Sequence, residues 1–238
     1  IAYGAWNGFA DPHVIQIMGR AGFDFICVDL QHSFITMTAL GPQLDALHKT
    51  GTPAAVRVPW NTPDLIMRAL DLGAEAIIVP MVNNAAEAKL AADSCRYAPA
   101  GTRSWGPIWR NVRATVPQAP EGDATATCIC MIETADGLAN VDAILATDGV
   151  DGIYIGPNDL SLSIGEERKG YLQSEKLHKS ILDVIARGRA AGKIVGIDCG
   201  GPEQAHYWRD QGVSFVISAN DSDLLMQSAA SMAAAHRV

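Results

Sequence analysis

The sequence predicts an α/β protein, a (β/α)8 TIM barrel, and three observations carry this prediction. Short apolar segments rich in β-branched residues alternate with longer amphipathic segments from one end of the chain to the other. Eight segments of each kind can be distinguished, as a TIM barrel requires. The length of 238 residues is close to the roughly 250 typical of that fold. The alternative is an open doubly wound sheet, but the segment 4–8 (GAWNG) is not its glycine-rich phosphate turn.

Each expected strand is a short, mostly apolar run bounded by turn-forming residues. The expected strands are 3–8, 23–30, 53–59, 76–82, 126–133, 150–156, 194–198 and 213–219. The expected helices are 12–21, 36–49, 63–72, 84–95, 135–146, 174–191, 202–211 and 221–235. Several begin at Pro or Asp and end before Gly, because proline fits the first helical turn and glycine fits the C-terminal cap.

We expect the whole chain, 1–238, to form a single barrel domain with one long insertion between a helix and the next strand, at about 97–125. This segment contains several prolines, Trp105, Trp109 and three arginines. Connections of this length are usually functional or disordered. Its aromatic and arginine content favours an ordered loop or short helix that packs on another surface, and a simple surface insertion is the alternative.

The composition excludes several functional classes. Hydrophobic residues make up 48% and charged residues 18% of the chain, which is typical of a globular protein. The net charge of −8 disfavours nucleic acid and acidic membranes as partners. No apolar run approaches the roughly 18 residues of a membrane span, and the start lacks signal-peptide features. The five cysteines form no C-x-x-C pair, so we expect a reducing compartment, the cytoplasm, and small molecules as partners.

Polar residues stand at the carboxyl ends of several predicted strands, where TIM barrels place their active sites. These residues are Asp29 and His32 after the second strand, Arg57 in the third, Glu133 after the fifth, Asp159 after the sixth and Asp198 after the seventh. A strand-end carboxylate by itself is most often a helix cap or a turn residue. A histidine, an arginine and two carboxylates around one barrel mouth instead predict a site for an oxygen-ligated divalent metal and an anionic substrate.

The residue types suggest a role for each member of this set. Glu133 and Asp159 come from adjacent strands, and carboxylates suit Mg²⁺ or Mn²⁺, with Co²⁺ and Zn²⁺ as further candidates. His32 is the only histidine expected at a strand end, and histidine is suited to proton transfer near neutral pH. Arg57 would stabilise an enolate with its permanent charge. Among the lysines only Lys169 lies in a strand-to-helix loop, so imine chemistry is not expected.

Two cysteines of the fifth strand offer a different metal site. Cys128 and Cys130 point to one face of that strand and are conceivable zinc ligands. We interpret them as small apolar core residues, like Cys27 in the second strand.

Several motifs in a fixed order identify a family resemblance over almost the whole chain. They are Phe23-Asp24, Val28-Asp29 with His32, 56–61 (VRVPWN), 79–82 (VPMV), 97–103 (YAPAGTR), 132–134 (IET) and 156–161 (GPNDLS). With these motifs the sequence resembles the HpcH/HpaI aldolases, metal-dependent class II pyruvate aldolases. The resemblance implies reversible aldol cleavage and addition between a 2-oxo acid, pyruvate or hydroxypyruvate, and an aldehyde, through a metal-bound enolate.

The resemblance also implies roles for individual residues. Glu133 and Asp159 would hold the metal, Arg57 would contact the keto oxygen, and His32 would be the base, acting through a bound water. The substrate-binding residues would be Trp6, Arg57, Gly156, Pro157, Asn158 and Asp159. Backbone N–H groups around Asn158 and Asp159, at the start of a helical turn, would receive the substrate carboxylate.

Asp71 is the resemblance's candidate for raising the basicity of His32, and the expected geometry disagrees. Asp71 ends the third helix, which runs antiparallel to its strand and therefore finishes at the end of the barrel opposite the mouth. The negative end of the helix dipole also disfavours a carboxylate there. Asp71 is therefore either structural or, together with the 97–125 segment, serves the mouth of a neighbouring subunit. The resemblance implies a homohexamer, a trimer of dimers, with the last helix exchanged between paired subunits.

Two departures from the family pattern and three alternatives stay open at this stage. Gln31 stands where many members have Glu, and Met131 stands where many have a Gln that contacts the substrate, so the preferred 2-oxo acid is expected to differ. The alternatives are a citryl- or malyl-CoA lyase, a barrel that binds a ligand without catalysis, and a phosphate-binding barrel that uses Gly200 and Gly201.

Overall fold

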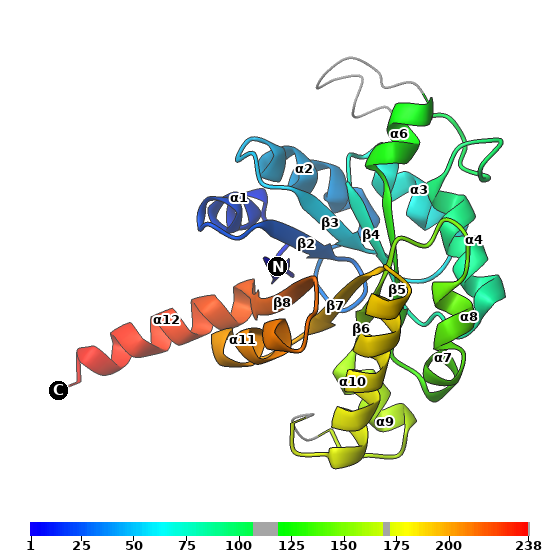
Figure 1. The fold of residues 1–238 in the computed structure, drawn as a ribbon. Coiled ribbons are helices and arrows are strands. Elements are labelled where there is room, and N and C mark those ends of the chain that lie inside the picture. Colours follow the sequence, from blue (N-terminus) through cyan, green and yellow to red (C-terminus); the bar gives the residue numbers. More distant parts are fainter. Residues whose placement is uncertain (107–118, 169–171, 238) are drawn as a thin grey trace.

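The structure is a computed structural model, which describes residues 1–106, 119–168 and 172–237. Eight parallel strands form a closed barrel in sequence order, with β1 pairing β8 to complete the ring (Figure 1). The strands are β1 (Ala2–Asn7), β2 (Phe25–Asp29), β3 (Ala54–Arg57), β4 (Ala76–Val79), β5 (Thr127–Ile132), β6 (Gly152–Ile155), β7 (Ile194–Asp198) and β8 (Phe215–Asn220). The predicted α/β fold, a (β/α)8 barrel, is confirmed. That the chain is a single domain stays a prediction.

Two strands end earlier than predicted because a proline follows them. β3 stops at Arg57 rather than at Pro59, and β4 stops at Val79 rather than at Val82. Proline lacks a backbone N–H and cannot continue the ladder of a parallel sheet. The effect is useful for the site, because the backbone leaves the sheet directly after the strand-end residues.

The helices surround the barrel, except that the last one extends away from it. They are α1 (Pro12–Arg20), α2 (Met37–His48), α3 (Pro63–Asp71), α4 (Ala85–Cys95), α6 (Ala119–Thr125), α7 (Ala135–Ala139), α8 (Val141–Leu145), α9 (Pro157–Ser163), α10 (Glu175–Ala190), α11 (Pro202–Asp210) and α12 (Asp221–Ala235). The expectation of one continuous helix over 135–146 is wrong. Asn140 leaves the helical conformation, and its side chain donates a 2.9 Å hydrogen bond to the Asn83 carbonyl. Such side-chain bonds compete with helical ones.

The core has two layers, because successive strand residues face opposite sides of the sheet. The barrel interior holds Cys27, Ala55, Ile78, Ile129, Met131, Tyr154, Phe215 and Ile217. Cys128 and Cys130 face outward and lie in the larger core between sheet and helices. All five cysteines are buried free thiols. The interpretation of these cysteines as core residues is confirmed.

Aromatic rings fill the amino-terminal end of the barrel, opposite the mouth, and glycines make room for them. Phe25 packs edge-to-face against Phe215 at 5.7 Å between ring centroids. A Cβ on Gly4 would lie 2.2 Å from the Phe25 ring, and a Cβ on Gly196 would lie 2.1 Å from the Phe215 ring. Interiors packed this tightly have no room for an added methyl group. The glycines of β1 and β7 are therefore required by ring packing.

The substitution Gly196→Ala tests this packing. We expect it to lower the free energy of unfolding by about 1–3 kcal/mol, because the methyl group must displace the Phe215 ring. Gly41→Ala in α2 is the matched control: its Cβ would meet Leu72 at 3.5 Å, an ordinary contact. Alanine favours the helix there by up to about 1 kcal/mol. Urea unfolding of both variants measures the difference, and equal stabilities would contradict the packing argument.

The predicted insertion begins as an ordered segment after α4. Tyr97 forms an isolated parallel bridge to Arg103, and the Arg103 guanidinium lies 4.5 Å from the centre of the Tyr97 ring. Trp105 packs on the same ring at 5.0 Å. The prediction that this connection packs on another surface also concerns Trp109, Arg110 and Arg113. These three residues lie outside the described residues.

The last helix, α12, leaves the barrel and extends away from it (Figure 1). Its residues beyond the first turn are exposed, including the large apolar side chains Leu224, Leu225, Met226 and Met232. This arrangement leaves the apolar side chains of α12 without a packing surface in the described chain. Among the described residues, no helix is both long enough and apolar enough to cross a membrane.

Candidate active site

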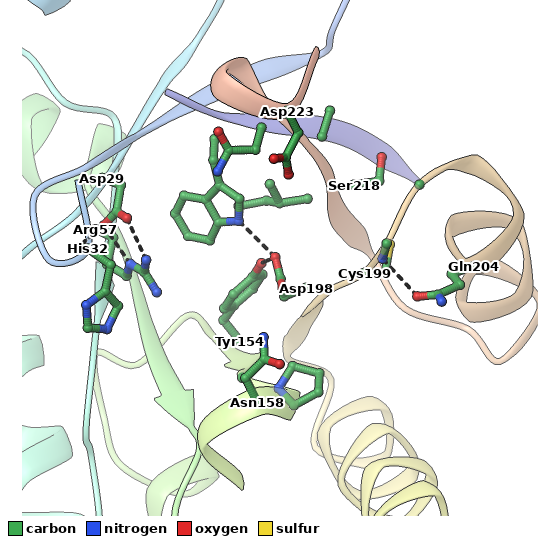
Figure 2. Close-up of a pocket in the computed structure, with 18 of the residues that line it drawn as sticks. Asp29, His32, Arg57, Tyr154, Asn158, Asp198, Cys199, Gln204, Ser218 and Asp223 are labelled. Carbon is green, nitrogen blue, oxygen red and sulfur yellow. Dashed lines mark hydrogen bonds and ion pairs between the residues drawn. The ribbon is translucent and has the colours of Figure 1, made fainter. Parts of the chain in front are cut away.

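A cavity of about 1050 Å³ opens at the carboxyl ends of the strands. The sequence-predicted residues that line it are Trp6, His32, Arg57, Glu133, Gly156, Pro157, Asn158 and Asp159. Figure 2 shows His32 and Arg57 on one side of this cavity and Asp198 on the other. The barrel topology thus brings together every predicted site residue except Asp71.

Arg57 at the end of β3 is fixed by a two-pronged ion pair with Asp29 at the end of β2. The Arg57 Nε donates to Asp29 Oδ1 at 2.8 Å, and Nη2 donates to Oδ2 at 2.7 Å (Figure 2). Burial works against both charges, but the pair more than offsets it: the pKa of Asp29 is lowered and the pKa of Arg57 is raised. Arg57 therefore stays cationic, with Nε and Nη2 held against Asp29.

Asp29 also shapes the loop that carries His32. Its Oδ1 accepts the backbone N–H groups of Gln31 at 3.0 Å and His32 at 3.3 Å. The His32 side chain is exposed and lines the cavity. The same carboxylate thus orients the arginine through its side chain and the histidine through its backbone.

The indole of Trp6 links this cation to the opposite wall. The Arg57 guanidinium carbon lies 4.4 Å from the centre of the Trp6 ring, a cation–π contact. The indole Nε1 donates to Asp198 Oδ1 at 2.8 Å. Trp6 packs edge-to-face on Tyr154, whose hydroxyl also approaches Asp198 Oδ1 at 3.4 Å. The Trp6 ring, which lines the cavity, is therefore held from both sides.

Glu133, directly after β5, is a buried carboxylate with a defined orientation. Its Oε1 accepts the backbone N–H of Met81 at 2.7 Å. Met81 has φ +58°, a conformation that costs a non-glycine residue free energy and that occurs preferentially at functional sites. On the other side, a Cβ on Gly156 would lie 2.9 Å from Glu133 Oε2. A strained residue and a required glycine thus fix one carboxylate.

The donor set of the mouth fits a divalent cation with oxygen ligands. Burial raises the pKa of Glu133, and the negative charge of Asp159 raises it further. A cation between the two carboxylates would relieve this repulsion. The described residues contain no group of three or more histidines, cysteines or carboxylates arranged to hold a metal ion. Two carboxylates alone would leave coordination positions for water and substrate, as Mg²⁺ and Mn²⁺ sites usually do.

Asp71 lies outside the cavity of its own subunit. Its carboxylate is buried at the end of α3 and accepts a 2.7 Å hydrogen bond from Arg103 Nη2. Burial raises its pKa, and the charges of Arg103 and Arg68 oppose that rise. The expected position at the barrel end opposite the mouth agrees with the structure.

The wall formed by β6 and β7 holds residues without a definite role in the sequence-based prediction. Asp198 could be a turn residue or a metal-site residue from sequence alone, and the structure places it inside the cavity. Tyr154 faces the barrel interior by strand alternation, a signal that was available in the sequence. The Gly200 N–H donates to Gln204 Oε1 at 2.8 Å. That bond occupies a donor that a phosphate cradle would need.

A closed (β/α)8 barrel whose mouth combines a paired arginine, a histidine and two carboxylates fits one class of protein, the metal-assisted aldolases. Residues 2–228 match the family described as HpcH/HpaI aldolase/citrate lyase. The chain belongs to this family. It is a class II aldolase, a carbon–carbon lyase, rather than a non-catalytic barrel.

Known relatives cover nearly the whole chain. A hydroxypyruvate/pyruvate aldolase from Rhizorhabdus wittichii is 39% identical over 215 residues, 90% of this chain and 85% of the relative. A 2-dehydro-3,6-dideoxy-6-sulfogluconate aldolase from Pseudomonas putida is 36% identical over 228 residues, 95% of this chain and 89% of the relative. The crystal structure of an HpcH/HpaI aldolase/citrate lyase family protein from Burkholderia cenocepacia superposes with a TM-score of 0.91 at 27% identity, covering 100% of this chain and 95% of that one.

The substitution Asp29→Asn tests the central ion pair. Breaking a buried pair from one side leaves a charge without its partner, so we expect the free energy of unfolding at pH 7 to fall by about 3 kcal/mol. The pKa of Asp29 is lowered by folding, so its stabilisation is present above about pH 4 and is lost as the pH falls through the folded-state pKa. The difference between wild type and variant should therefore shrink in acid. Denaturant unfolding across pH measures it, and a pH-independent difference would contradict the assignment.

Proposed function

We propose that the enzyme catalyses reversible aldol cleavage and addition between a small 2-oxo acid, pyruvate or hydroxypyruvate, and an aldehyde. One observation carries the proposal: the cavity is lined by the fixed Arg57 guanidinium and by two carboxylates, Glu133 and Asp159. The Arg57 guanidinium is suited to stabilising the negative charge that develops on a keto oxygen. The similarity to a hydroxypyruvate/pyruvate aldolase supports the substrate class.

Each residue then has a part in cleavage. Arg57 binds the keto oxygen and stabilises the negative charge that develops there when the C3–C4 bond breaks. His32 takes the proton of the C4 hydroxyl, through a water molecule, and releases the aldehyde. The backbone N–H groups of Asn158 and Asp159, in the first turn of α9, receive the substrate carboxylate. Trp6 forms the floor against which the planar 2-oxo acid lies.

Glu133 and Asp159 would hold a divalent cation, Mg²⁺ or Mn²⁺, with Co²⁺ or Zn²⁺ as substitutes. When bound, such a cation supplies Lewis-acid polarisation of the 2-oxo acid and neutralises its carboxylate. The donor chemistry supports this role, because two hard oxygen ligands with repelling charges face one cavity.

The substitution Glu133→Gln tests the metal site. We expect turnover to fall to background while the fold survives, because the amide keeps the shape of the side chain but loses its charge. EDTA treatment of wild type should have the same effect, reversed by Mn²⁺. Glu75→Gln, at the opposite end of the barrel, is the control and should keep full activity. Release of pyruvate or hydroxypyruvate from aldol adducts measures turnover, and full activity of metal-free enzyme would refute the proposal.

We also propose that the enzyme works as a homohexamer, a trimer of dimers that exchange their last helices. The exposed apolar residues of α12, which extends from its own barrel, support this arrangement. Asp71 would then serve His32 of a neighbouring subunit, together with the 97–125 segment. The five free thiols support a cytoplasmic location.

Mixed assemblies test the shared site. His32→Ala and Asp71→Asn subunits should each be nearly inactive alone, because each lacks one half of the pair. Random mixed hexamers should regain about a quarter of the wild-type activity, since some sites then combine an intact His32 with an intact Asp71. Coexpression followed by activity assay measures the recovery, and light scattering gives the assembly size. An inactive mixture of hexamers would place Asp71 in a purely structural role.

A further inference from the structure

Asp198 lies on the inner wall of the cavity and has no role in the proposed aldol steps, and its two carboxylate oxygens differ. Oδ1 accepts two hydrogen bonds, from Trp6 Nε1 at 2.8 Å and from the Tyr154 hydroxyl at 3.4 Å. Among the described residues, no hydrogen bond reaches Oδ2. Figure 2 shows the Asp198 side chain beside Tyr154, facing the space enclosed by the labelled residues.

A carboxylate at this position costs free energy, and a cavity wall does not require one. The neighbours of Asp198 along the inner surface are apolar or aromatic, among them Tyr154 and Ile217. Burial disfavours an ionised carboxylate unless hydrogen bonds compensate it. Two hydrogen-bond donors compensate the burial of Oδ1. An apolar side chain at this position would line the cavity without needing such donors. Asp198 is half-buried and lines the cavity, so Oδ2 is available to a hydrogen-bond donor on the ligand.

The location of Oδ2 narrows the choice of donor. The Arg57 guanidinium stacks 4.4 Å from the Trp6 ring centre, and the same indole donates to Asp198. The Asp198 carboxylate and the Arg57 guanidinium therefore contact the same indole ring. The charged rim residues Asp223 and Arg168 lie on exposed segments, α12 and the connection after α9. Asp198 thus belongs to the inner end of the cavity, where the 2-oxo acid binds, and not to the exposed rim.

Resting on the proposed function, we propose that Asp198 is a specificity-determining residue for a hydroxylated 2-oxo acid. Its Oδ2 accepts a hydrogen bond from the hydroxyl on C3, the carbon next to the keto group. Hydroxypyruvate carries this hydroxyl and pyruvate does not, so the site prefers hydroxypyruvate. A methyl group facing Oδ2 would instead leave a carboxylate oxygen buried without a partner.

The test uses a half-reaction that needs no aldehyde. The enzyme is loaded with Mg²⁺ and kept free of Mn²⁺. Proton NMR then measures the exchange of the C3 protons in D2O, separately for hydroxypyruvate and for pyruvate. The rate without enzyme is subtracted from each. In Asp198→Leu we expect the hydroxypyruvate-to-pyruvate ratio of exchange rates to fall about 10- to 100-fold, the value of a hydrogen bond to a charged group. Pyruvate exchange should fall less than hydroxypyruvate exchange, because the lost hydrogen bond to Trp6 affects both substrates alike.

Two further variants separate specificity from structure. In Asp198→Asn the amide oxygen still accepts from Trp6, whereas an NH2 group replaces Oδ2, so the ratio should fall while pyruvate exchange stays near wild type. A purely structural role through Trp6 would lower both rates together. Asp223→Asn removes a negative charge from the rim and should leave the ratio unchanged. Saturation-transfer NMR of the two 2-oxo acids gives binding independently of turnover, and the same ratio should fall there.

Three results would overturn the assignment. The first is an unchanged ratio in both Asp198 variants. The second is a change confined to the preference for glycolaldehyde over acetaldehyde in aldol addition, which would place the contacted hydroxyl on the aldehyde. The third is wild-type enzyme that exchanges neither 2-oxo acid, a result that would refute the proposed function itself and is distinguishable from the other two.

Discussion

The ion pair between Arg57 and Asp29 is the interaction on which the mouth of the barrel depends. It joins the ends of two adjacent strands, and its two short hydrogen bonds fix the plane of the guanidinium. Trp6 packs on one face of that plane, and the loop with His32 is bonded to the same carboxylate. A cation held this firmly does not need to reorganise when charge develops on a substrate, which is the main advantage of a preorganised site.

The opposite side of the mouth is built from carboxylates, and the contrast explains how an acidic protein can handle an acidic substrate. Glu133 is held by the strained Met81 and by the close approach of Gly156, and the negative charge of Asp159 raises its pKa. Such repulsion between like charges would be relieved by a bound cation. The net charge of −8 is therefore a poor guide to the charge of the ligand, because the local charges at the barrel mouth decide what binds.

Stability and chemistry are separated along the barrel axis. Glycines and interlocked phenylalanines fill the amino-terminal end, where Gly4 and Gly196 leave room for two rings. The carboxyl-terminal end keeps a large cavity lined by charged groups. This division lets the strand-to-helix loops carry chemistry while the opposite end supplies packing. The extended α12 lies outside this division, with exposed apolar side chains beyond its first turn.

The sequence by itself determined the eight βα units, the strand-end position of Arg57, His32, Glu133 and Asp159, and the family, because alternation and strand-end motifs are local patterns. The sequence also predicted that Asp71 lies at the end of its own barrel opposite the mouth, because a helix runs back antiparallel to the strand before it. Only the tertiary structure decided what Asp198 contacts, because its partners come from β1 and β6, 192 and 44 residues away in the chain. The break at Asn140 and the strain at Met81 were likewise decided by contacts across loops, which no periodicity records.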